Sequence, residues 1–239
     1  MRRFGRYIPV LLAGVLVVGL QIVLSATDTT YYMTQITMSA YYSLVVIGLC
    51  VLMGYGGQVS LGHAGFFAIG GYTCAALTTC NLFAYREVPL INWLVAMGLA
   101  AERQDLYGAW ILSFTPWPAF IVSLGLTVLI AFVIGLPVIR LRGHYLAMAT
   151  LGFGLIVYRV VLGARIFGQA DGLSNVPPMK LLNLLEVNGR AAFRVQNYYI
   201  AWGAILAVMI LSINLIQSRV GRALRSIHQN EEAAQSPGG

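Results

Sequence analysis

Hydrophobic residues in this chain of 239 residues gather in long blocks, and most polar residues lie between the blocks. The blocks follow neither the alternation of a half-buried strand nor the stripe of an amphipathic surface helix. Because a helix needs roughly 20 apolar residues to cross a bilayer, they predict an all-α integral membrane protein with about six transmembrane helices. The six blocks cover residues 7–25, 36–53, 62–79, 117–139, 145–162 and 198–216.

The first block follows the basic start MRRFGR, an outline shared by signal peptides and first membrane helices. The block is long for the apolar part of a signal peptide, so we interpret it as an uncleaved helix. A further apolar piece at residues 89–101 is short for a span and has charged residues on both sides. We interpret it as an interfacial or re-entrant segment. If it crossed the membrane, every later span would invert.

Two segments precede the last block. FGQADGLSNVPP, residues 167–178, is rich in turn-forming residues and predicts a loop. LLNLLEVNGRAAFRVQ, residues 181–196, predicts a short surface helix.

Composition agrees with a membrane protein. The chain is 59% hydrophobic and 10% charged, with a mean hydropathy of +0.77, whereas soluble domains carry about 25% charged residues. A net charge of +7 could suggest a nucleic-acid partner. The arginines flank hydrophobic blocks, however, and do not alternate with aromatic residues as in single-strand binders. The three cysteines have no metal-ligand spacing and read as apolar packing residues.

Charge placement predicts the orientation. With the N-terminus inside, the inner segments hold eight basic residues and two acids, and the outer segments hold six of each. The inner charges also crowd short loops near the ends of spans, where the positive-inside rule acts most strongly. We therefore expect an N-in, C-in protein.

The most unusual stretch is GYGGQVSLGHAGFFAIGGY at residues 54–72. Gly57 and Gly62 have the spacing of a phosphate-binding P-loop. His63 and Ala64 stand where that loop needs its lysine and its hydroxyl, so the nucleotide chemistry is missing. A metal site is not expected either, because His63 has no second ligand at suitable spacing.

The spacing of small residues in this stretch suggests helix packing. On a continuous helix they would form one smooth ridge, the members being Gly56, Ser60, Ala64 and Ala68. Tight packing alone would explain the ridge. Gln58 and His63 favour more than packing, because polar groups cannot face lipid unsatisfied. They must face a neighbouring helix, a break in this one, or a wet transport pathway.

Residues 141–154, LRGHYLAMATLGFG, repeat this pattern, with Ala147, Thr150 and Gly154 on one helical face. Arg159 lies further along the same block, near its outer end. We interpret it as an arginine that snorkels to the membrane surface; a charge in the pathway is the alternative.

The tail after the last block predicts a short amphipathic helix with an apolar face of Val220, Leu224 and Ile227. Such a segment can fray at the end of the chain, lie as a helix on anionic lipid, or dock into the groove of a partner protein. Glu231 and Glu232 favour a partner, because acids are repelled by anionic lipid.

Taken together, these blocks resemble the LivH/LivM-type permeases of bacterial branched-chain amino-acid ABC importers, and LivM more closely. The resemblance rests on residues 54–72, on residues 141–154 and on GRALRSIHQNEEAA in the tail, in the right order. It covers most of residues 36–236.

The resemblance implies a function and a set of partners. The chain would be a multi-pass permease subunit in the bacterial inner membrane, with no enzymatic activity and no cofactor. Its partners would be the lipid bilayer, a second LivH-like permease subunit, two ATP-binding subunits and a periplasmic substrate-binding protein. Residues 1–216 would form the transmembrane domain and residues 217–239 a cytosolic coupling segment.

The candidate residues fall into two groups. The translocation pathway or its helix packing would involve Gly56, Gly57, Gln58, Ser60, Gly62, His63, Ala64, Ala68, Thr150 and Gly154. Coupling to the ATPases would involve Val220, Arg222, Ala223, Leu224, Ile227, Glu231, Glu232, Ala233, Ala234 and Gly238. In the second group, Glu232, Ala233, Ala234 and Gly238 match the EAA-x3-G pattern of importer permeases.

The chain departs from the family pattern in two places. Leu155 stands where the family usually has Glu, and the chain stops inside the coupling loop, with Pro237 where a helix would continue. We therefore expect a fragment or frameshifted product of a longer protein with further spans. The alternatives for function are a urea or amide importer permease of the same style, a non-transporting assembly subunit, and a secondary transporter or channel subunit. A secondary transporter or channel would need an acidic residue inside a span, and all eight acidic residues fall outside the blocks.

Overall fold

The computed structural model describes residues 5, 7–83, 86, 88–104, 108, 110–138, 141, 143–181, 185–222 and 224. Within these residues the chain forms two compact units. The first comprises residues 1–60 and 180–239, and the second comprises residues 61–179.

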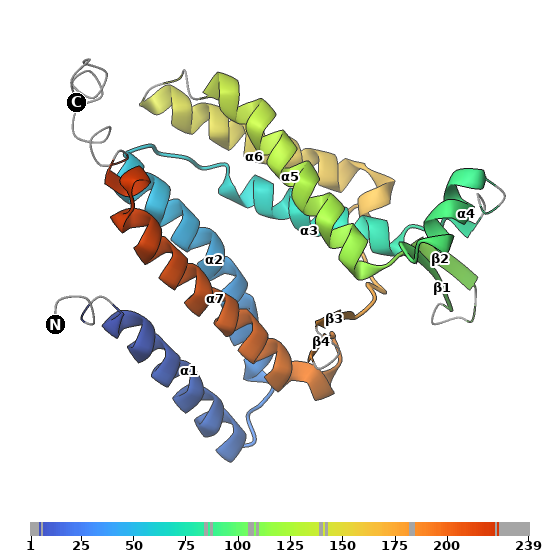
Figure 1. Cartoon of the computed structure of the whole chain (residues 1–239), viewed down its shortest axis with the longest axis horizontal. Coiled ribbons are helices and arrows are strands. Elements are labelled where there is room, and N and C mark those ends of the chain that lie inside the picture. The colour runs from blue at the N-terminus through green and yellow to red at the C-terminus, as the bar shows by residue number, and fades with distance from the viewer. Residues whose placement is uncertain are drawn as a thin grey trace. The chain divides into compact units, whose positions relative to one another are not determined.

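The first unit is built from three long helices: α1 (Ile8–Ala26), α2 (Tyr32–Gly56) and α7 (Arg194–Gln217). Figure 1 shows α2 and α7 side by side. Their contact buries Ala40 of α2 against Ala201 and Ile205 of α7. Small residues at this contact let the two backbones approach closely, which is how helices associate in lipid.

Hydrogen bonds join α1 to α7 at both ends of their contact. The Tyr198 hydroxyl donates to the carbonyl oxygen of Val17 over 2.8 Å, and the Tyr7 hydroxyl donates to Asn214 Oδ1 over 2.9 Å. The first residues of α1 therefore meet the last turns of α7, so the two helices are antiparallel. Helices α2 and α7 run in the same direction (Figure 1).

The second unit packs α3 (His63–Thr79) against α5 (Pro116–Val138) and α6 (His144–Gly163). Both α3 and α6 run in the same direction, and α5 runs against them (Figure 1). The 3-10 turn η3 (Arg165–Phe167) follows α6. Left-handed backbone at Gly168, Gln169, Gly172 and Asn175 confirms the predicted turn-rich loop.

An extension of this unit follows α3. It consists of α4 (Pro89–Ala96) and an antiparallel hairpin of β1 (Ala100–Gln104) and β2 (Trp110–Phe114), in which Ala100 faces Phe114. A small core of Ile91, Ala100 and Leu112 joins the short helix to the hairpin. The Leu82 amide donates to the Leu112 carbonyl over 2.8 Å, which ties the hairpin to the end of α3.

The predicted mainly helical membrane architecture is confirmed. Five of the described helices are long and apolar enough to cross a membrane: α1, α2, α5, α6 and α7. The sixth predicted span is α3, which has 17 residues. At 1.5 Å per residue it is about 26 Å long, which lies at the lower end of what a bilayer requires.

Two segments between the spans differ in length or type from the expectation. The eight residues of α4 extend only about 12 Å, so this helix is too short to cross a hydrocarbon core of about 30 Å. Among the described residues of 181–196, no separate surface helix is present, and residues 194–196 belong to the first turn of α7. The short strands β3 (Met179–Leu181) and β4 (Leu185–Val187) pair there, and the 3-10 turn η4 (Ala191–Phe193) follows.

Candidate functional site

The glycine-rich stretch contains a helix break. Helix α2 ends at Gly56, and Gly57 adopts left-handed backbone with φ of 66°. Residues 57–62 are not helical, and α3 begins at His63. The single ridge predicted from Gly56 to Ala68 is therefore wrong, because Gly56 and Ser60 lie outside the helix that carries Ala64 and Ala68. The break that the polar residues indicated is present.

The segment just before α3 is bonded to α6. The backbone amide of Leu61 donates to Thr150 Oγ1 over 3.0 Å. The same hydroxyl lies 3.0 Å from the Leu146 carbonyl oxygen, to which it donates within its own helix. Thr150 is 8% exposed, so this side chain provides a buried acceptor for a backbone group that no helix satisfies.

Glycines let the two helices come close at this point. A Cβ at Gly62 would lie 3.2 Å from the Thr150 carbonyl oxygen, and a Cβ at Gly65 would lie 3.0 Å from the Phe153 ring. On the α6 side, a Cβ at Gly154 would lie 3.8 Å from the Leu61 carbonyl oxygen. Three predicted site residues, Gly62, Thr150 and Gly154, are thus brought together from two segments far apart in the sequence.

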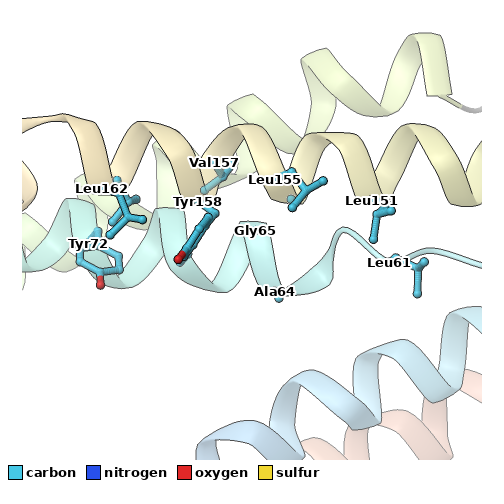
Figure 2. Close-up of a pocket in the computed structure, with 12 residues that line it drawn as sticks. Leu61, Ala64, Gly65, Tyr72, Leu151, Leu155, Val157, Tyr158 and Leu162 are labelled. Carbon is cyan, nitrogen blue, oxygen red and sulfur yellow. The ribbon is translucent and has the colours of Figure 1, made fainter. Parts of the chain in front are cut away.

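Beside this contact lies a groove of about 310 Å³ between α3 and α6. Figure 2 shows its lining, in which Ala64 and Tyr72 come from α3 and Leu151, Leu155 and Tyr158 come from α6. The predicted residues Ala68 and Gly154 also line it. The surface is mostly apolar, and the small residues leave room that larger side chains would fill.

Sequence reasoning missed the two tyrosines of the groove. Both hydroxyls point to the same side of the helix pair in Figure 2. Tyr72 follows Ala68 by four residues, and Tyr158 follows Gly154 by four residues. The same spacing that defined the small-residue faces would therefore have identified both.

The other polar residues of the stretch lie outside the groove lining. Gln58 is exposed and Ser60 is buried within the non-helical segment. The Nδ1 atom of His63 is buried and has no hydrogen-bond partner among the described residues. Gln58 and Ser60 thus lie within the break itself, and His63 is the first residue of α3.

The first turn of the tail is described as far as Leu224. Residues 219–222 are helical, with Val220 57% exposed and the Arg222 guanidinium donating to the Gln217 carbonyl over 3.2 Å. A Cβ at Gly56 would lie 4.0 Å from Leu224 Cδ2, so the start of the tail lies close to the end of α2. The remaining predicted coupling residues lie outside the described residues: Ala223, Ile227, Glu231, Glu232, Ala233, Ala234 and Gly238.

Comparison with known proteins gives the family. Residues 31–238 match the family described as the permease component of branched-chain amino acid transport systems. The chain belongs to this family. The match includes α2, the glycine-rich break and both helices of the groove, and it confirms the resemblance seen in the sequence.

Two curated members are similar over much of the chain. The high-affinity branched-chain amino acid transport system permease proteins LivM of Salmonella typhimurium and Escherichia coli are each 28% identical over 221 residues. The alignments cover 84% of this chain and 45% of each relative, so the chain spans about half the length of the curated relatives it matches. No solved structure matches the chain.

Proposed function

We propose that the chain acts as a permease subunit of an ABC importer that moves branched-chain or related amino acids across the inner membrane. The observation that carries this proposal is the groove between α3 and α6. It is formed by the two segments that resemble the permease family, and its lining is apolar with two tyrosine hydroxyls. An aliphatic side chain fits such a lining, and the hydroxyls could bond the polar end of an amino acid.

The tail supports coupling to partner ATPases. Leu224 lies beside Gly56, at the point where α2 gives way to the non-helical residues 57–62. A displacement of residues 219–224 would first move this break. Gly57 has a positive φ there, a backbone conformation that few residues other than glycine adopt readily. ATP-driven movement of the partner subunits would in this way reach the segment that leads into the groove.

Uptake by reconstituted vesicles tests the proposal. Vesicles carrying the chain, a LivH-like permease subunit, two ATP-binding subunits and the binding protein should accumulate radiolabelled leucine only with ATP. Ala68→Leu places a larger side chain in the groove and should lower leucine uptake strongly, because the added side chain occupies volume that the cargo would need. Ala204→Leu is the matched control, because Ala204 is an exposed alanine on α7.

The outcomes separate the candidate functions. Leucine uptake that persists without the ATP-binding subunits would overturn the importer proposal in favour of a secondary transporter or channel. ATP-dependent uptake of urea or amides in preference to leucine would retain the importer and change its cargo. Equal leucine uptake by the Ala68→Leu and Ala204→Leu variants would exclude the groove from the pathway.

A further inference from the structure

The second unit has another groove next to the first, and the two share Tyr72, Val157 and Val161 in their linings. It has a volume of about 270 Å³ and lies between α3, α5 and α6. Leu126 and Ile130 of α5 and Ile156 and Val160 of α6 line it, and Phe167 lies at one end. Ile156 is 64% exposed and Val160 is 53% exposed, so the groove is open toward the surface of the helix bundle. An apolar groove of this kind suits a hydrocarbon chain.

Arg159 stands at the edge of this groove. It is exposed and has neither a hydrogen bond nor an ion pair among the described residues. A shallower depression around its side chain is lined by Leu155, Ile156 and Val160, so two of its residues also line the groove. The guanidinium and the apolar groove are therefore continuous parts of one surface.

An anion would stabilise an unpaired arginine on an apolar surface. A charged side chain inside the hydrocarbon costs around 3 kcal/mol on insertion scales. Arg159 lies four residues before the end of α6 at Gly163, which is about 6 Å along the axis. An arginine side chain is long enough to reach the polar boundary from that depth. The anions found at that boundary are the phosphates of the lipids.

We propose that this surface is a phospholipid site. One acyl chain lies in the groove between α5 and α6, and the guanidinium of Arg159 bonds the phosphate of the same molecule. Two observations lead to this ligand independently: an apolar groove that is open at the surface of the helix bundle, and a cation of matching charge at its edge. The proposal goes beyond transport and does not depend on which cargo the chain moves.

Photolabelling of the purified chain in dodecyl maltoside micelles, which contain no phosphate, tests the site. The probe is phosphatidylglycerol that carries a diazirine in its acyl chain, and labelled peptides are mapped by mass spectrometry. Label should concentrate on residues 126–130 and 156–160. Unlabelled phosphatidylglycerol should compete about fivefold better than the diacylglycerol with the same chains, because only the phospholipid offers a phosphate to arginine.

Variants separate the two halves of the site. Arg159→Gln should lower labelling about fivefold, and Arg159→Lys should keep most of it. Val160→Trp should block the groove while Arg159 is intact. Val128→Trp, an exposed residue of α5 that does not line the groove, should leave labelling unchanged. Unfolding temperatures of all four variants report whether each is folded.

Three results would overturn the proposal. Equal labelling of the wild type and Arg159→Gln would show that the guanidinium does not bind the lipid phosphate. Label spread evenly over the exposed faces of α5 and α6 would show ordinary annular lipid. A groove that stays unlabelled but crosslinks to a copurified permease subunit would assign this surface to a protein partner.

Discussion

At the scale of single residues, Thr150 supplies a hydrogen-bond acceptor for a backbone amide at the start of α3. The amides before and within the first turn of a helix lack intrahelical acceptors. The residue at the N-cap position is Gly62, which has no side chain to serve as a cap. In a bilayer there is no water to take its place. The Thr150 hydroxyl, which α6 supplies, therefore does for Leu61 what a capping side chain does in a soluble protein.

Removing this hydroxyl should be costly. Thr150→Val keeps the branched shape and leaves the Leu61 amide without its acceptor, so we expect a loss of about 1–3 kcal/mol in the free energy of unfolding. Thr150→Ser should retain most of the stability. The measurement is chemical or thermal unfolding of the purified chain in detergent.

Thr37→Val is the matched control for that loss. Thr37 is buried, and its hydroxyl bonds only the Met33 carbonyl within α2. If Thr37→Val and Thr150→Val destabilise the protein equally, the contact with Leu61 adds nothing.

The glycines at the same contact should tolerate substitution unequally. Gly62→Ala would bring a methyl group 3.2 Å from a backbone oxygen that cannot move aside easily, so we expect a loss of about 1–3 kcal/mol. Gly71→Ala places its methyl group in open space and should keep or raise stability, because alanine favours a helix over glycine by about 1 kcal/mol. Comparison of the two unfolding midpoints tests this, and similar midpoints would show that the close approach at Gly62 is not required.

At the scale of elements, α3 is held at both ends by other parts of the second unit. Its start is bonded through Leu61 to α6. Near its end, Nη2 of Arg103 on β1 donates to the Thr78 carbonyl oxygen over 3.0 Å. A cation at a helix C-terminus also interacts favourably with the helix dipole. The helix that carries one wall of the groove is thereby fixed in position along its axis.

Loss of the second contact should loosen the hairpin. We expect Arg103→Ala to speed hydrogen exchange at the amides of β1 and β2, because it removes the side-chain hydrogen bond that links this hairpin to the last turn of α3. Hydrogen exchange followed by mass spectrometry measures this. Arg86→Ala is the control, since its ion pair with Glu102 lies at the surface and contributes less than about 1 kcal/mol. Unchanged exchange in Arg103→Ala would show that the small apolar core and the backbone bond between Leu82 and Leu112 hold the hairpin without Arg103.

The elements also show how far the sequence could predict this structure. Hydropathy located the long helices, although α2 begins at Tyr32 rather than 36 and α7 at Arg194 rather than 198. Those extra turns are polar, and a hydropathy block leaves them out. The hairpin of β1 and β2 was missed because its pairing partners are separated by residues with no strand pattern. In the candidate site, spacing found Ala64 and Gly154, but the break at Gly57 depends on a backbone angle that spacing does not encode.

At the scale of the whole molecule, the helix directions constrain the topology. In the first unit α1 runs against α2 and α7, and in the second unit α5 runs against α3 and α6 (Figure 1). Six spans in strict alternation require these relative directions within each unit. They also require that residues 89–101 stay on one side, since a crossing there would reverse α5 and α6 relative to α3.

Labelling of single cysteines tests the predicted N-in, C-in orientation. Cys50, Cys74 and Cys80 are first replaced by alanine, and one cysteine is then introduced at Asp28, Glu102, Asp171 or Arg219, all of which are exposed. A membrane-impermeant maleimide added to intact cells should label the first three positions. Arg219→Cys should react only after permeabilisation, because the positive-inside rule puts the arginine-rich tail in the cytoplasm.

Asp28 lies before residues 89–101 and Glu102 lies after them, so labelling of Asp28→Cys without Glu102→Cys would mean that this segment crosses after all. Labelling of Arg219→Cys in intact cells would instead show that the final span runs in the other direction and that the tail lies outside the cytoplasm. A cytosolic ATPase could not reach the tail there, so the proposed coupling through Leu224 would be excluded.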